Sequence, residues 1–169
     1  MNVIQELHQY EEGLRPPPPS AAHIWEDGTW VLTDENAAEL LRLEGERLCD
    51  KVDAAADSTR RVLAGDPLRA LEYQQAALEA QAFKDQGYPK KAVPLSVSAW
   101  VVKGRTARQA ADQILAKAAE FEAKLLTLRE LRLKAKAQIR AHVAKGKAEL
   151  ATQTADDTLA AIGALRLRA

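Results

Sequence analysis

The stretch ILAKAAEFEAKLLTLRELRLKAKAQI, residues 114–139, decides the fold of this chain. Within it one set of positions recurs at alternating intervals of four and three residues, namely Ile114, Ala118, Phe121, Leu125, Leu128, Arg132, Ala135 and Ile139. Side chains at this spacing share one face of an α-helix and form the seam of coiled coils. The pattern predicts a long helix with a coiled-coil-like seam. The charge of Arg132 argues against a tight homodimer through this seam, since a buried unpaired charge is costly.

Start and stop signals divide the rest of residues 34–169 into further helices. Gly65-Asp66-Pro67 ends one helix and begins the next, because Asp caps a helix and Pro fits its first position. Thr106 and Gln109 form a Thr-x-x-Gln capping box ahead of the long helix. These signals predict helices at about residues 34–64, 67–86, 96–103, 107–145 and 147–165.

The first of these helices has apolar and small residues at seven-residue intervals. They are Leu41, Leu48, Ala55 and Val62, with Gly45, Val52 and Thr59 between them. The second helix carries Leu71, Leu78 and Phe83. The two-residue link between the two helices predicts an antiparallel helical hairpin. We therefore expect a mainly α fold, an elongated antiparallel helical bundle over residues 34–169.

Residues 1–33 are of a different kind and form a separate segment. The run Pro16, Pro17, Pro18 and Pro19 is stiff and extended and excludes a helix. Asp27-Gly28 then lies between two runs that contain Trp25 and Trp30, which is a strong signal for a β-hairpin. One hairpin is only marginally stable in water. The hairpin is therefore expected to pack on the helices or on a partner. Residues 1–20 cannot form a core by themselves and are expected either to be disordered or to lie along a partner, for example at a sheet edge.

Charge is segregated along a chain that is neutral as a whole. The 169 residues hold 24 Lys and Arg against 24 Asp and Glu, yet residues 1–33 sum to −4 and residues 105–169 to +6. A basic half is typical of nucleic-acid binding, but no aromatic residues alternate with these bases, which argues against that class. No run reaches the roughly 18 apolar residues of a membrane span. The single Cys49 excludes a disulfide framework and fits a reducing compartment.

Motifs that would indicate catalysis are missing from the sequence. There is no GxGxxG, P-loop, GxSxG or HExxH pattern, and the three histidines are far apart. Cys49 follows Leu48 on the first helix, where we expect a small buried hydrophobic residue rather than a nucleophile. We therefore predict no enzyme, no cofactor and no metal site.

The candidate partner-binding residues lie in the first segment, since Trp and Tyr supply large contact areas at low entropic cost. They are Tyr10, Pro16, Pro17, Pro18, Pro19, Ile24, Trp25 and Trp30. Two possibilities stay open for Trp25 and Trp30: they pack the hairpin on the helices, or they hold a partner. Trp100 is expected to plug the end of the bundle.

Several stretches resemble the tail fibre assembly proteins of tailed phages and of R-type pyocins. The first is the proline run followed by Trp25-x-Asp27-Gly28-x-Trp30 and an Ala- and Leu-rich helix. The more specific ones are GDPLRALEY at residues 65–73, AQAFKD at residues 80–85 with Gly87-Tyr88, and the block from Ala99-Trp100 to Asp112. Together they span about residues 16–140. The chain departs from the smaller members because Trp100 leads into Val101-Val102 and a long helix rather than a compact C-terminal motif.

The resemblance implies a chaperone without enzymatic activity. It would help a trimeric tail fibre to fold or assemble in the cytoplasm of the bacterial host, by binding the C-terminal receptor-binding tip of the fibre. Retention on the finished particle stays open. The alternative is a structural coiled-coil tail or scaffold protein that self-associates through the seam of the long helix, and a weak self-association is compatible with both.

Overall fold

The computed structural model describes residues 6–11 and 13–167, and its mainly α fold confirms the predicted class. Four short strands precede five helices. The strands are β1 (His8–Tyr10), β2 (Gly13–Arg15), β3 (Ile24–Glu26) and β4 (Thr29–Val31). The helices are α1 (Asp34–Ala64), α2 (Pro67–Asp85), α3 (Leu95–Ser98), α4 (Ala107–Val143) and α5 (Ala148–Leu167).

The helix starts follow from the caps that the sequence contains. The Thr33 hydroxyl accepts a hydrogen bond from Asn36 N at 3.2 Å, and the Asp66 carboxylate accepts one from Leu68 N at 2.8 Å. Both halves of the predicted capping box are present between Thr106 and Gln109. The helix expected over residues 96–103 is shorter than predicted, because α3 ends at Ser98 and the chain then turns toward Gly104.

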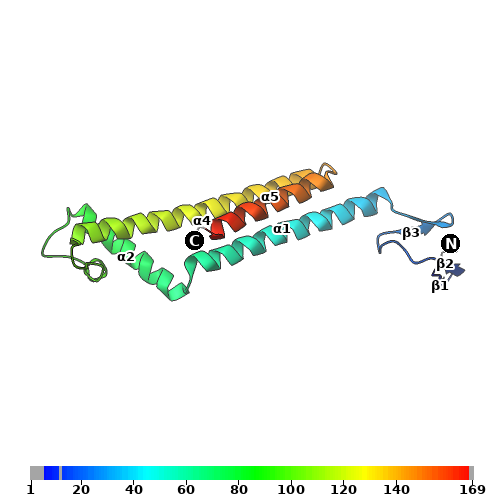
Figure 1. Ribbon diagram of the computed structural model, residues 1–169. Coiled ribbons are helices and arrows are strands. Elements are labelled where there is room, and N and C mark those ends of the chain that lie inside the picture. The colour runs from blue at the N-terminus through cyan, green and yellow to red at the C-terminus, as the bar shows by residue number, and fades with distance from the viewer. Residues whose placement is uncertain (1–5, 12, 168–169) are drawn as a thin grey trace.

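Helices α1, α4 and α5 form a three-helix bundle in which α4 is antiparallel to the other two (Figure 1). The core contains Leu48, Val52, Leu128, Ile139 and Ile162, each at most 2% exposed. Every residue of the predicted α4 seam, from Ile114 to Ile139, is buried or half-buried. The seam prediction is confirmed, and its partners are helices of the same chain. Cys49 is buried as expected, and this burial raises the pKa of its thiol.

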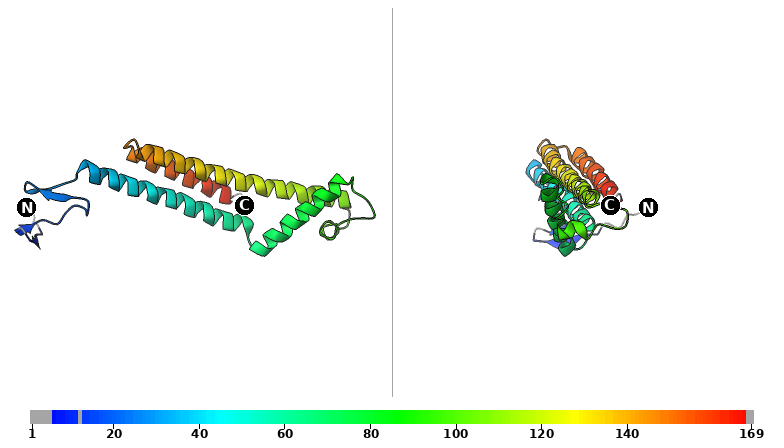
Figure 2. Two further views of the ribbon diagram at one scale, coloured as in Figure 1. Left: turned by 180° about the vertical axis from the view of Figure 1, so that it is seen from behind. Right: turned by 90° about the vertical axis from the view of Figure 1, so that its left-hand side faces the viewer.

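The predicted antiparallel hairpin of the first two helices is wrong. Helix α2 packs on the first half of α4 together with α3, while α1 packs on the second half (Figures 1 and 2). Gly65, with φ of 62°, turns the chain so that α2 continues along α4 instead of folding back on α1. Apolar side chains that the predicted hairpin would have covered are consequently exposed: Val62 by 44%, Leu71 by 61% and Leu78 by 61%.

Arg132, the charged residue in the seam, has a partner within the chain. Its Nη1 donates to Asp53 Oδ1 at 3.0 Å, and Lys136 Nζ donates to Asp53 Oδ2. Partial burial raises the pKa of Asp53, but the hydrogen bonds from Lys136 and Arg132 outweigh it, so the pKa lies below its ordinary value of 3.8. The carboxylate thus compensates both cations and fixes the register of α1 against α4.

We predict that Asp53→Asn lowers the free energy of unfolding by about 1–3 kcal/mol at neutral pH, because two cations lose their charged acceptor. The folded pKa of Asp53 is depressed, so its contribution is present above the unfolded value of 3.8 and is lost as pH falls through the folded pKa. The difference between wild type and variant should therefore shrink below about pH 4. Urea denaturation at several pH values measures this.

The control is Asp57→Asn, which removes an exposed i,i+3 pair with Arg60 on the same helix. It should cost at most about 0.5 kcal/mol. An equal loss in both variants would contradict the role given to Asp53.

Gly45 lies where α1 closely approaches α4 at Val143. A Cβ placed on it would lie 2.6 Å from Val143 Cγ2, whereas a Cβ on Gly163 in α5 meets nothing within 4 Å. We predict that Gly45→Ala destabilises the fold by about 1–3 kcal/mol despite the better helix propensity of alanine. Gly163→Ala should instead stabilise it by about 0.5–1 kcal/mol.

Thermal or urea unfolding of the two variants gives the comparison. Val143→Ala in the same chain should remove most of the penalty of Gly45→Ala. A penalty that persists unchanged in the double variant would show that Val143 is not the cause.

Candidate partner-binding head

Residues 6–11 and 13–33 form a small head made of two β-hairpins. In the first, β1 pairs with β2, with His8 opposite Arg15. In the second, β3 pairs with β4, and Trp25 lies opposite Trp30. Asp27 and Gly28 have φ of 50° and 82°, the left-handed backbone that a two-residue hairpin turn needs. The hairpin predicted at Asp27-Gly28 is confirmed, and the β1–β2 hairpin was not predicted.

An arginine surrounded by aromatic rings joins the two hairpins. The Arg15 guanidinium lies 4.7 Å from the ring centre of Tyr10, 5.0 Å from that of Trp25 and 5.8 Å from that of Trp30. The rings also contact one another edge to face, with centres 5.9 Å apart for Tyr10 and Trp30 and 5.1 Å apart for the two tryptophans. Cation–π and edge-to-face contacts of this kind are favourable. They connect strands that share no backbone ladder.

The proline run reaches this cluster through its first residue. Trp30 Nε1 donates a hydrogen bond to the carbonyl oxygen of Pro16 at 2.8 Å. Pro17, Pro18 and Pro19 are exposed, and Ile24 is 43% exposed. Of the candidate residues, the structure therefore gathers Tyr10, Pro16, Trp25 and Trp30 around Arg15, and leaves the others on the surface.

Sequence reasoning missed Arg15, although a signal was present. It is the single base among residues 1–33, which hold five acids and three of the candidate aromatic residues. A lone cation in such a segment is well placed to contact aromatic faces. The contact itself depends on how the two hairpins fold together.

The head lies beyond the helical bundle rather than on it. The first turns of α1 extend past the α4–α5 turn, and the hairpins lie further out still (Figures 1 and 2). A hydrogen bond from Asn36 Nδ2 to the carbonyl of Ala22, 2.6 Å long, ties the head to the start of α1. Trp25 and Trp30 pack on each other and on Tyr10 and Arg15, so the possibility that they pack the hairpin on the helices is wrong.

The surface of the head offers two kinds of contact. Each hairpin has two strands, so among the described residues every strand has one edge without a strand neighbour. An extended segment of another chain can pair with such an edge as an additional strand. Acidic and apolar side chains are exposed around these edges, and they include Glu11, Leu14, Ile24 and Glu26. This combination suits recognition of an extended chain.

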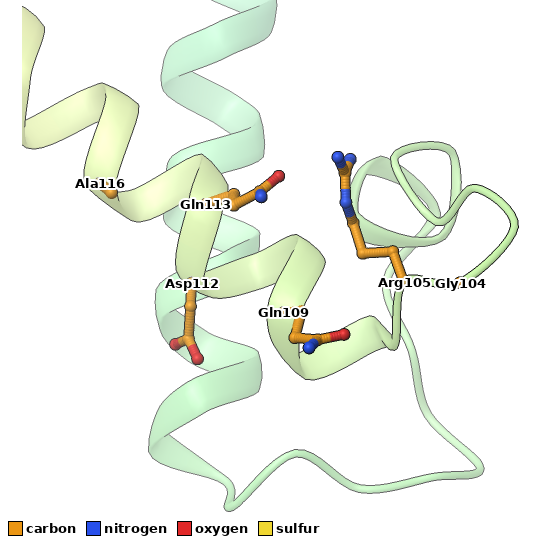
Figure 3. A pocket seen from close by; sticks show the side chains of 6 residues that line it. All are labelled: Gly104, Arg105, Gln109, Asp112, Gln113 and Ala116. Atoms are coloured by element: carbon orange, nitrogen blue, oxygen red, sulfur yellow. The ribbon is translucent and has the colours of Figure 1, made fainter.

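A shallow recess lies at the other end of the molecule, at the start of α4 (Figure 3). Its side chains make structural bonds: Gln109 completes the helix cap, and Asp112 accepts from the Tyr88 hydroxyl at 2.6 Å, which raises the pKa of Tyr88. Arg105 and Gln113 project to one side of α4 and Asp112 to another (Figure 3). The polar groups of the recess do not converge on a common point.

Trp100, at the same end of the molecule, does not plug the bundle as predicted. It is 43% exposed and lies under the Arg105 guanidinium, 5.7 Å from the ring centre. Val97, fully buried with Phe83, Ala110 and Ala111, closes this end instead. The turn after α3 directs Trp100 outward, which the sequence did not indicate.

The described residues contain no group of three or more His, Cys, Asp or Glu side chains placed to hold a metal ion. None of their helices is both long and apolar enough to cross a membrane.

Comparisons of the chain with protein-family models, with curated proteins and with solved structures returned no match. The resemblance to tail fibre assembly proteins therefore stays a prediction, and the geometry of the head is the main basis for a function.

We predict that Arg15→Ala loosens the head but not the bundle, because the guanidinium is the group common to all three rings. Cation–π contacts contribute about 0.5–2 kcal/mol each. In a Trp100→Phe background the tryptophans that remain are Trp25 and Trp30. Their near-ultraviolet circular dichroism signal should be weaker in Arg15→Ala and should disappear at a lower temperature. The helical signal should melt as in the parent.

The matched control is Arg61→Ala, an exposed arginine at the end of α1. It should leave the tryptophan signal unchanged. An unaltered tryptophan signal in Arg15→Ala would show that the hairpins hold together without the cation.

Proposed function

We propose that this chain is a non-enzymatic assembly chaperone that holds its client with the head while the helical bundle carries the head at one end. The observation that carries the proposal is the position of the aromatic cluster: Tyr10, Trp25 and Trp30 contact one another in a head that lies beyond the end of the helical bundle (Figures 1 and 2). A head with its own aromatic cluster and with open strand edges is preorganised to bind an extended or β-rich chain.

The client we propose is a trimeric tail fibre, bound near its C-terminal receptor-binding tip. The resemblance of residues 16–140 to tail fibre assembly proteins supports this choice. Intertwined β-rich trimers pair residues far apart in sequence, so they fold slowly and expose strand edges meanwhile. A helper that covers those edges in the bacterial cytoplasm would favour correct assembly without a nucleotide or a metal.

The scaffold alternative, self-association through the α4 seam, has less support. The seam residues of α4 are buried or half-buried against α1, α2, α3 and α5 of the same chain, so they would have to leave these partners first. Any assembly of copies is therefore expected to use another surface.

The test is co-expression of the tail fibre with three forms of the protein. Full-length chain should raise the yield of soluble trimeric fibre. A form without residues 1–32 and the variant Trp25→Ala/Trp30→Ala should both lose most of this gain, because each removes the cluster. Light scattering and gel filtration of the fibre measure the outcome.

Tyr73→Ala is the matched control, since Tyr73 is an aromatic residue on α2 with 63% exposure and no place in the head. It should assist the fibre as well as the parent. If the truncated form still yields soluble trimeric fibre, the head does not bind the client.

A further inference from the structure

The end of the molecule opposite the head carries exposed apolar side chains that are close together in the sequence. We call this end the tip: the chain between α2 and α4, residues 86–106. Leu95 is 85% exposed, Val102 57%, Trp100 43% and Val101 39%. The same segment contributes Val97 to a small separate core with Phe83. A cluster of exposed large apolar side chains on a folded support indicates a contact surface.

The segment that carries these apolar side chains is also positively charged. Residues 88–108 contain five bases and no acid: Lys90, Lys91, Lys103, Arg105 and Arg108. Arg108 faces Tyr88 and Asp112, whereas Lys90, Lys91 and Lys103 are exposed and have no ion-pair partner among the described residues. The tip therefore fits a partner that presents apolar side chains within an acidic surrounding.

The head has these properties. Its Glu11, Glu26 and Asp27 are exposed, and its one base, Arg15, is directed into the aromatic cluster. Between the acids lie the exposed apolar side chains of Leu14, 65% exposed, and Ile24, 43% exposed. The head is thus complementary to the tip both in charge and in apolar character.

A head cannot reach the tip of its own chain, because α1 and α4 hold the two at opposite ends of the molecule (Figures 1 and 2). The contact requires a second copy. We propose that two copies associate antiparallel, about a two-fold axis, with the head of each on the tip of the other. Two-fold symmetry makes the second contact a consequence of the first, so each weak contact reinforces the other.

This dimer differs from the coiled-coil alternative because it leaves the α4 seam inside each copy. It does not depend on which client the head binds. It has a functional consequence all the same: the head is covered in the dimer, so a client that binds the head must compete with a second copy.

The test uses the full-length chain and sedimentation equilibrium at about 0.01 M and about 1 M salt, between which screening of exposed charges changes strongly. We expect a dimer at low salt and at least tenfold weaker association at high salt. The tip variant Lys90→Glu/Lys103→Glu and the head variant Glu11→Lys/Glu26→Lys change exposed residues only. Each should be monomeric by itself, since like charges then meet at both contacts.

An equimolar mixture of the head variant and the tip variant should dimerise again, because each head then meets a tip of opposite charge. The control Lys134→Glu/Lys145→Glu makes the same charge change at exposed positions outside the tip, and it should dimerise like the parent. Its far-ultraviolet spectrum, and those of the other variants, report whether the fold is intact.

Four outcomes would overturn the proposal. They are a monomer of the parent chain at low salt, a dimer that persists in both the head variant and the tip variant, growth into longer oligomers, and failure of the equimolar mixture of the two variants to associate. The parent chain can also be tested with anionic lipid vesicles. If it binds them, if only the tip variant loses this binding, and if the oligomeric state of the variants equals that of the parent, the tip is a membrane-binding surface instead.

Discussion

The apolar seam of α4 is the surface on which every other helix packs. At 37 residues α4 is longer than α1, which has 31, and α5, which has 20, so neither can cover α4 along its whole length. The chain covers it in two sections, with α1 and α5 on the second half and α2 and α3 on the first. This division produces two separate cores and an elongated molecule, and it places the tip far from the start of α1.

The head is stabilised by a different physical principle. It has too few residues for an apolar core, and its hairpins share no backbone ladder. Aromatic rings gathered around one guanidinium, with the Trp30 hydrogen bond to Pro16, take the place of a core. Among the described residues, the hydrogen bonds between the head and α1 are the one from Asn36 to Ala22 and those of the Thr33 cap. Because these ties are few, the head can respond to a partner without disturbing the bundle.

Features that depend on neighbouring residues were predicted well. The caps at Asp66 and Thr106, the Asp27-Gly28 turn and the α4 seam all follow from residues within one turn or one repeat. Features that depend on distant residues were not. The path of α2, the outward direction of Trp100 and the role of Arg15 all arise from contacts between separate elements. The two-residue link, for instance, predicted a hairpin because short links usually join antiparallel helices.

The sequence by itself determined which residues are helical, where most helices begin and end, and that residues 1–33 stand apart from the rest. These properties are local, since they rest on capping hydrogen bonds, backbone preferences and periodicity. Tertiary structure alone decided which helix covers which part of α4, that Asp53 neutralises Arg132 across 79 positions of sequence, and that the head lies outside the bundle. These features depend on how the lengths and charges of distant segments match, and the sequence pattern of a single segment does not contain that information.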